Sequence, residues 1–82
     1  MRLSKYSDYA LRVVMYAALR DPALATIEEV ADGFDISRHH LVKIVHALGR
    51  AGFLATRRGI GGGFTLAQPA AKIVLGDIVR LT

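Results

Sequence analysis

The stretch "TIEEVADGFDISRHHLVKIVHALGRAG", residues Thr26–Gly52, decides the fold of this chain. It contains two segments whose apolar residues recur with the period of an α-helix. In the first segment Thr26 lies three residues before Glu29, which predicts a capping box at a helix start. We expect the buried stripe of this helix to consist of Ile27, Val30, Ala31 and Phe34. "GFDIS" then breaks the pattern, so a turn of three or four residues joins two helices, which is the helix-turn-helix arrangement.

The second helix of this pair, in "SRHHLVKIVHALGRAG", divides into an apolar face and a basic face. We expect Ser37 to cap it and Gly52 to end it. The apolar face consists of Leu41, Ile44, Val45 and Leu48. At about 100° per residue, the opposite face collects His39, Lys43, His46 and Arg50, with no acidic residue among them. The alternative is a solvated face, but such a face usually mixes both signs of charge. The pattern therefore favours contact with a polyanion.

A β-hairpin is predicted directly after this helix, from "FLATRR" and "GFTLA" on either side of a glycine cluster. A hairpin in this position makes the module a winged helix-turn-helix, in which the third helix enters the DNA major groove. Glycines at the wing tip would allow positive φ and close approach to a sugar–phosphate backbone. Arg57 and Arg58 at its base would reach phosphates or a narrow minor groove. The alternative is an ordinary hairpin loop without a ligand.

Two further helices are expected on either side of this module. Residues 4–20 have helical apolar spacing, with Ser4 or Ser7 as the cap and Asp21-Pro22 as the stop. Because this helix is apolar nearly all round, we expect a second layer against it, from a partner subunit or from further chain. Residues 73–82 resemble the first turns of a fourth helix without a C-cap signal, so we expect the chain to be a fragment. The predicted fold is mainly α with a small β-hairpin, a single winged helix-turn-helix domain over residues 1–82.

Composition is consistent with a small basic domain that binds nucleic acid. The 82 residues are 52% hydrophobic, which excludes intrinsic disorder as the main state, and eleven Lys and Arg against seven Asp and Glu give a net charge of +4. The sequence contains no cysteine, which fits a reducing compartment. No apolar run approaches the roughly 18 residues of a membrane helix, so we expect a cytoplasmic protein without membrane contact.

Metal and enzyme functions are disfavoured by spacing. His39 and His46 are seven residues apart, hence about 10 Å along a helix, and His40 points to a different side. This separation is too long for one ion with bonds near 2 Å. The glycine cluster lacks both the G-x-G-x-x-G order and the G-K-[ST] ending of nucleotide-binding loops. There is no paired carboxylate beside a positioned base, so we expect no enzymatic activity.

Four segments together resemble the NsrR/IscR-type family of bacterial winged-helix repressors. They are "MRLSKYSDYALRVVMYAAL", "ISRHHLVKIVHALGRAGFL", "RRGIGGGFTLA" and the run from Ile73 to Arg80, and they cover essentially the whole chain. The most specific is the wing pattern R-G-x-G-G-G-[FY]-x-L, from Arg58 to Leu66. The start from Asp8 to Arg12, "DYALR", is closer to the nitric-oxide-sensing branch. Val74 departs from the family, which usually has a capping Thr there.

The resemblance implies a homodimer paired through a long C-terminal helix, which would lie beyond this chain, and a palindromic operator near a promoter. Several members hold an iron–sulfur cluster on three cysteines beyond about residue 90, which this chain lacks. In the nitric-oxide-sensing branch an acid of the first helix completes the ligand set, and Asp8 is at the matching position. The implied function is a sequence-specific repressor that binds double-stranded DNA, with nitric-oxide or redox sensing in a missing C-terminal part and no cofactor within this chain. The alternatives are a cluster-free regulator of the same family and a winged-helix module that binds an acidic protein.

The candidate DNA-binding residues come from the third helix and the wing. They are Ser37, Arg38, His39, His40, Lys43, His46, Arg50, Arg57, Arg58, Gly59, Gly61 and Gly62.

Overall fold

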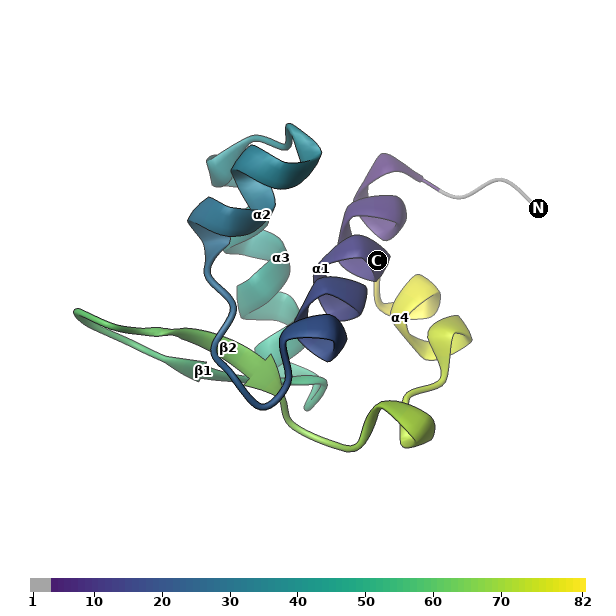
Figure 1. The fold of residues 1–82 in the computed structure, drawn as a ribbon. Coiled ribbons are helices and arrows are strands. Elements are labelled where there is room, and N and C mark those ends of the chain that lie inside the picture. Colours follow the sequence, from purple (N-terminus) through teal and green to yellow (C-terminus); the bar gives the residue numbers. More distant parts are fainter. Residues whose placement is uncertain (1–3) are drawn as a thin grey trace.

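The computed structural model describes residues 4–82 (Figure 1); residues 1–3 of the predicted domain lie outside the described residues. The expected mainly helical fold with one antiparallel hairpin is confirmed. The elements in order are α1 (Lys5–Arg20), α2 (Ile27–Phe34), α3 (Arg38–Arg50), β1 (Leu54–Arg57), β2 (Gly63–Leu66), a short 3₁₀ helix (Ala70–Lys72) and α4 (Leu75–Leu81). The hairpin projects from the helical body, and α4 lies on the opposite side of α1 (Figure 1).

Helix α1 is central and contacts α3, α4 and β2. Of the two residues expected to cap α1, Ser4 is the one that does so, because its hydroxyl accepts a hydrogen bond from the Ser7 amide at 3.0 Å. The buried core draws on all four α-helices and both strands of the hairpin. Its members are Ala10, Val13, Val14, Ala17, Ala25, Val30, Ile36, Leu41, Ile44, Val45, Leu48, Leu54, Phe64 and Ile78. Met15 and Leu19 of α1 stay exposed, so the neighbouring helices cover only part of its apolar circumference.

The predicted capping box of α2 is present and is tied to α1. The Thr26 hydroxyl accepts from the Glu29 amide at 3.1 Å, and the Thr26 amide donates to Glu29 Oε1 at 2.9 Å. Tyr16 of α1 donates its hydroxyl to the other oxygen, Glu29 Oε2, at 3.1 Å. The hydrogen bond from the Thr26 backbone amide lowers the pKa of Glu29. This contribution to stability is therefore present at neutral pH and is lost as the pH falls through that lowered pKa.

The expected apolar stripe of α2 is only partly buried. Val30 is fully buried, whereas Ile27 and Ala31 are half-buried and Phe34 is 37% exposed. Phe34 lies in the last turn, where the ring meets Tyr16 edge-on and the Arg12 guanidinium lies 5.5 Å from the ring centre. The prediction that Phe34 is a buried residue was wrong, because helical spacing does not reveal that the end of so short a helix is only partly covered by α1.

The turns at both ends of α3 use left-handed residues. Asp35 has φ +53° and lets the Ile36 amide reach back to the Ala31 carbonyl, which ends α2. Gly52 has φ +89°, as expected of a helix-ending glycine, and the next amide, of Phe53, donates to the Leu48 carbonyl at 3.0 Å. Short hydrogen-bonded turns therefore join α2 to α3 and α3 to the hairpin.

The hairpin is anchored in the core through a contact that the sequence does not reveal. Its register pairs Leu54 with Leu66 and Thr56 with Phe64. On the other edge of β2, Phe64 exchanges two backbone hydrogen bonds with Ala25, of 2.8 and 2.9 Å. Gly63 permits this pairing, because a Cβ there would lie 2.2 Å from the Ala25 carbonyl oxygen. The segment before α2 thus joins the wing through an isolated β-bridge.

We therefore expect Gly63→Ala to destabilise the protein by about 1–3 kcal/mol, since the clash is with backbone and cannot relax by a rotamer change. Gly33→Ala is the matched control, because Gly33 lies within α2 and a Cβ there meets nothing within 4 Å. That variant should gain about 0.5–1 kcal/mol from the lower flexibility of the unfolded chain. Urea unfolding monitored by circular dichroism measures both. Equal stabilities of the two variants would contradict the anchoring contact.

Helix α4 packs on α1 through its single buried residue, Ile78. Val74 precedes the helix and makes no side-chain capping bond, which agrees with its departure from a capping Thr. The hydroxyl groups of Ser7 and Thr82 are hydrogen-bonded, so the start of α1 meets the end of α4. Among residues 4–82, no helix has both the length and the apolar character needed to cross a membrane.

Candidate nucleic-acid interface

The outward face of α3 carries the predicted basic stripe. His39, Lys43, His46 and Arg50 are all exposed, while Leu41, Ile44, Val45 and Leu48 on the opposite side are buried. The division follows from helical geometry, because residues three and four apart share a face. Val42 also lies on the exposed side, with 46% of its surface accessible. The sequence analysis assigned Val42 to neither the apolar face nor the basic face of this helix.

The two flanks of α3 face different elements. Arg38, the first residue of the helix, points to α2, where its guanidinium pairs with Glu28. His40 is exposed but lies against α1, with its ring stacked 6.3 Å from that of Tyr9. His40 therefore does not join the stripe, although it was grouped with the DNA-binding candidates. Its contact with DNA stays a prediction.

The start of α3 differs from the expectation in one respect. Ser37 occupies the capping position, yet its side chain makes no capping hydrogen bond to the first turn of the helix. The residue is exposed, so its hydroxyl is accessible from solvent. The predicted position of Ser37 at the helix start is thus correct, but the predicted side-chain capping bond is not formed. The proposed contact of Ser37 with DNA stays a prediction.

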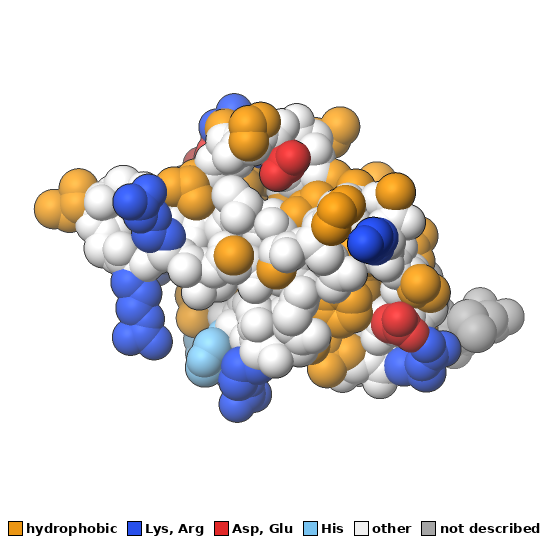
Figure 2. Space-filling view, turned by 90° about the horizontal axis from the view of Figure 1, so that it is seen from below, with side chains coloured by type: hydrophobic (Ala, Val, Ile, Leu, Met, Phe, Trp, Pro, Cys, Tyr) orange, Lys and Arg blue, Asp and Glu red, His pale blue; other side chains and the backbone are white. Residues whose placement is uncertain are grey.

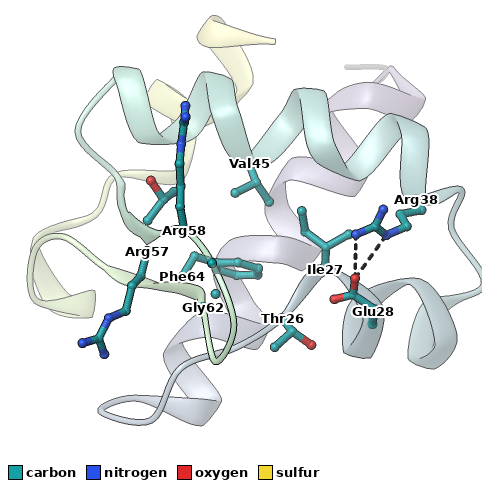
Figure 3. A pocket seen from close by; sticks show the side chains of 12 residues that line it. Thr26, Ile27, Glu28, Arg38, Val45, Arg57, Arg58, Gly62 and Phe64 are labelled. Atoms are coloured by element: carbon teal, nitrogen blue, oxygen red, sulfur yellow. Dashed lines mark hydrogen bonds and ion pairs between the residues drawn. The ribbon is translucent and has the colours of Figure 1, made fainter.

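The wing presents its two arginines on opposite sides of β1. Arg57 ends the strand and Arg58 follows it, and both are exposed. Successive side chains of a strand alternate in direction, and Figure 3 shows Arg58 pointing toward α3 while Arg57 points away. Arg58 thus belongs to the same surface as the basic stripe. The tip carries Ile60, which is fully exposed.

The glycines of the wing have two different roles. Gly59 and Gly61 have φ +93° and +77°, so they form the positive-φ turn that was predicted. Gly62 is half-buried, and a Cβ there would lie 2.2 Å from the Arg57 carbonyl oxygen. The close approach that Gly62 permits is therefore to its own chain, because the hairpin loop folds back on itself. Contact of these glycines with DNA stays a prediction.

Two grooves lie beside the wing where it meets α2 and α3. One has a volume of about 360 Å³ and extends from the start of α2 to the wing, with Ile27, Val45 and Phe64 as its apolar lining (Figure 3). The other, of about 340 Å³, is lined by His46, Gly49, Arg50, Leu54, Thr56 and Arg58. Thr56 and Arg58 line both, so the base of the wing lies between them. The lining of the second groove contains three basic side chains, those of His46, Arg50 and Arg58, and no acidic one.

The charge distribution on this surface is one-sided. In Figure 2, Lys, Arg and His side chains lie along the edge that includes the projecting hairpin, and no acidic side chain is visible between them. Glu28 is the single acid in the lining of either groove, and it is paired with Arg38. A surface of this kind attracts a polyanion such as the phosphate backbone of DNA.

Asp8 lies outside this interface, on α1. Its carboxylate accepts a hydrogen bond from Arg12 Nε at 3.2 Å, and both side chains are about half exposed. Within residues 4–82 no three His, Cys, Asp or Glu side chains gather closely enough to hold a metal ion. A single carboxylate paired with an arginine, in a chain without cysteine, does not fit an iron–sulfur cluster.

Comparison with known proteins identifies the family. A family model described as "Rrf2: Iron-dependent Transcriptional regulator" matches residues 3–82, nearly the whole chain. The chain belongs to the Rrf2 family. The resemblance to NsrR/IscR-type regulators is thereby confirmed. As a member of a family of transcriptional regulators, the Rrf2 chain is a DNA-binding domain and not an enzyme.

Solved structures support the Rrf2 fold. CymR, the global cysteine regulator of B. subtilis, has 27% identity and a TM-score of 0.89, and the match covers 99% of this chain and 64% of CymR. The oxidised form of CymR from Staphylococcus aureus has 30% identity and a TM-score of 0.90, with coverage of 99% and 66%. IscR from T. potens has 24% identity and a TM-score of 0.88, with coverage of 99% and 60%, and supports the fold alone. This Rrf2 chain thus spans about two thirds of the length of these proteins.

Proposed function

We propose that this chain is the operator-reading part of a dimeric, sequence-specific transcriptional repressor. The observation that carries the proposal is the position of Arg58 at the base of the wing, on the same surface as His46 and Arg50 of α3, with an acid-free groove between them. In this arrangement α3 enters the major groove and its outward residues meet base edges. The wing follows the backbone into the adjacent minor groove, where the arginines meet phosphates.

The twelve candidate residues divide by expected role. Arg38, His39 and Lys43 lie in the first half of α3 and would meet base edges and nearby phosphates. His46 and Arg50, in the second half, would contact the backbone together with Arg57, Arg58 and the wing glycines. Ser37 and His40, at the flanks of the helix start, would contact phosphates beside the groove.

The test is binding to promoter DNA in competition with random DNA. A sequence-specific regulator should prefer its operator by a factor of at least about 10³. A gel-shift titration with labelled promoter fragments and excess shuffled duplex measures this ratio. A winged-helix module that binds an acidic protein predicts weak binding without sequence preference, which moderate salt abolishes. That outcome would overturn the proposal.

Lys43→Ala should lower the magnitude of the salt dependence by about one unit in the plot of log K against log salt, if Lys43 contacts a phosphate. The variant lacks one cationic side chain, so its binding releases about one counterion fewer from the DNA. Titrations by fluorescence anisotropy at four or more salt concentrations give the slope. Lys72→Ala is the control, since Lys72 is an exposed lysine of the short 3₁₀ helix, outside the linings of both grooves. A slope unchanged in Lys43→Ala would remove this residue from the phosphate contacts.

Dimerisation on a palindromic operator is part of the proposal. Its support here is the exposed apolar surface of α1 and α4, where Met15, Leu19, Leu75 and Leu81 are uncovered. A two-fold dimer places its recognition helices one DNA turn apart, about 34 Å. We also infer that the protein acts in the cytoplasm, where operator DNA would be met.

The inducing signal is a separate hypothesis. Nitric-oxide or redox sensing through an iron–sulfur cluster rests on the family resemblance, with Asp8 as one ligand only if further chain supplies cysteines. A cluster-free regulator is the alternative. The absorbance spectrum of the anaerobically purified full-length protein tests this directly. A spectrum without cluster bands would remove the sensing hypothesis, and an unchanged cluster spectrum in Asp8→Ala would exclude Asp8 as a ligand.

A further inference from the structure

Arg38 and Glu28 form an ion pair at the edge of the proposed DNA surface. Arg38 Nε and Nη2 both donate to Glu28 Oε1, at 3.1 and 2.7 Å. The two side chains point toward one another from α3 and α2 (Figure 3). Both are more than half exposed, at 64% and 60%. Exposed pairs of this kind contribute little to stability.

Glu28 is held in its charged form by its own helix. It lies in the first turn of α2, and hydrogen bonding to the backbone there lowers the pKa of its carboxyl group, with a further contribution from Arg38. A carboxylate fixed at the start of a helix offers Arg38 a constant partner. On a surface that faces phosphates, the same negative charge opposes general DNA binding.

The pair with Glu28 leaves one edge of the Arg38 guanidinium available for a further contact. A guanidinium has five N–H donors in one plane, and Glu28 uses the edge formed by Nε and Nη2. The end formed by the two Nη groups can still donate two parallel hydrogen bonds. Guanine presents two acceptors with matching spacing, O6 and N7, in the major groove. Arg38 is also the first residue of α3, and the N-terminal residues of a recognition helix are those that contact base edges.

We propose that Glu28 is a positioning residue that holds Arg38 so that its free end reads one guanine of the operator half-site. This inference rests on the proposed function. Glu28 does not touch DNA itself; it limits the rotamers of Arg38 and weakens contact with DNA that lacks the guanine. Its contribution is therefore to discrimination more than to affinity.

The experiment uses a duplex selected from a random library by the wild-type protein, together with copies in which each guanine in turn is replaced by 7-deazaguanine. That analogue lacks the N7 acceptor and keeps Watson–Crick pairing. At one position wild type should lose about tenfold in affinity, and Arg38→Ala should bind both duplexes equally. Glu28→Ala should reduce the ratio of the affinities for the guanine and 7-deazaguanine duplexes from tenfold to threefold or less. The affinity of this variant for shuffled DNA should not fall. Glu28→Gln, whose amide oxygen accepts the same hydrogen bonds, should restore most of the ratio.

Two controls separate positioning from a general charge effect or a folding defect. Asp77→Ala removes an acid that pairs with Arg80 on α4, and should leave the ratio unchanged. Glu28→Ala combined with Arg38→Ala should discriminate no worse than Arg38→Ala alone, because the two residues act through one contact. Thermal unfolding checks that each variant is folded.

The outcomes are distinguishable. If Glu28→Ala keeps the wild-type ratio, or if the two substitutions reduce it independently, the role of Glu28 is overturned while sequence-specific binding stands. If the wild-type protein selects no preferred duplex from the library, the proposed function fails, and the role of Glu28 fails with it.

Discussion

Phe64→Ala is expected to destabilise this protein by about 3–5 kcal/mol, the cost of removing a buried aromatic side chain and leaving a cavity. Phe64 is 1% exposed and is among the largest fully buried side chains. Its backbone pairs with both Thr56 and Ala25, so one residue joins the wing to the helical body. A domain of this size has a total stability of roughly 4–12 kcal/mol, at 0.05–0.15 kcal/mol per residue. The variant should therefore be partly unfolded at 37 °C.

Phe34→Ala is the matched control, because it removes the same side chain from a site that is 37% exposed. It loses an edge-on contact with Tyr16 and the nearby Arg12 guanidinium, and leaves no enclosed cavity. We expect at most half the loss seen for Phe64→Ala. Urea unfolding followed by circular dichroism gives both free energies. Similar losses in the two variants would mean that the wing is not anchored in the core.

The second large effect concerns DNA. Arg58→Ala should weaken operator binding by about 1–3 kcal/mol, or about 5- to 150-fold in Kd. Arg58 lines both grooves between the wing and α3, so its loss removes charge from the centre of the proposed interface. Its side chain is exposed and no ion pair to it is formed within residues 4–82, so the stability of the fold should hardly change.

Arg80→Ala controls for net charge. Arg80 is an exposed arginine of α4, where it pairs with Asp77, and it lines neither groove. Anisotropy titrations with the operator duplex at one fixed salt concentration compare the two variants. Equal affinities of Arg58→Ala and Arg80→Ala would show that binding depends on overall charge and would remove Arg58 from the interface.

Periodicity was informative wherever one face of an element is covered. The buried side of α3 was predicted residue by residue, because a helix that packs on one side must place apolar residues three and four positions apart. The capping box of α2 and the helix-ending Gly52 were also predicted, since both are local hydrogen-bonding patterns. The same reasoning failed at Phe34 and passed over Val42, where exposure depends on which distant segment lies opposite.

Local chemistry in the sequence thus determined the order of the helices and hairpin, the apolar side of α3 and the basic residues that its other side exposes. Only the tertiary structure decided that Ala25 pairs with Phe64, that Gly63 is required by this pairing, that His40 lies against Tyr9, and that Glu28 holds Arg38. The physical reason is the separation along the chain over which each kind of interaction acts. Helical period and capping act within about one turn of chain, whereas these four contacts join residues ten or more positions apart, and their partners are set by how the elements pack.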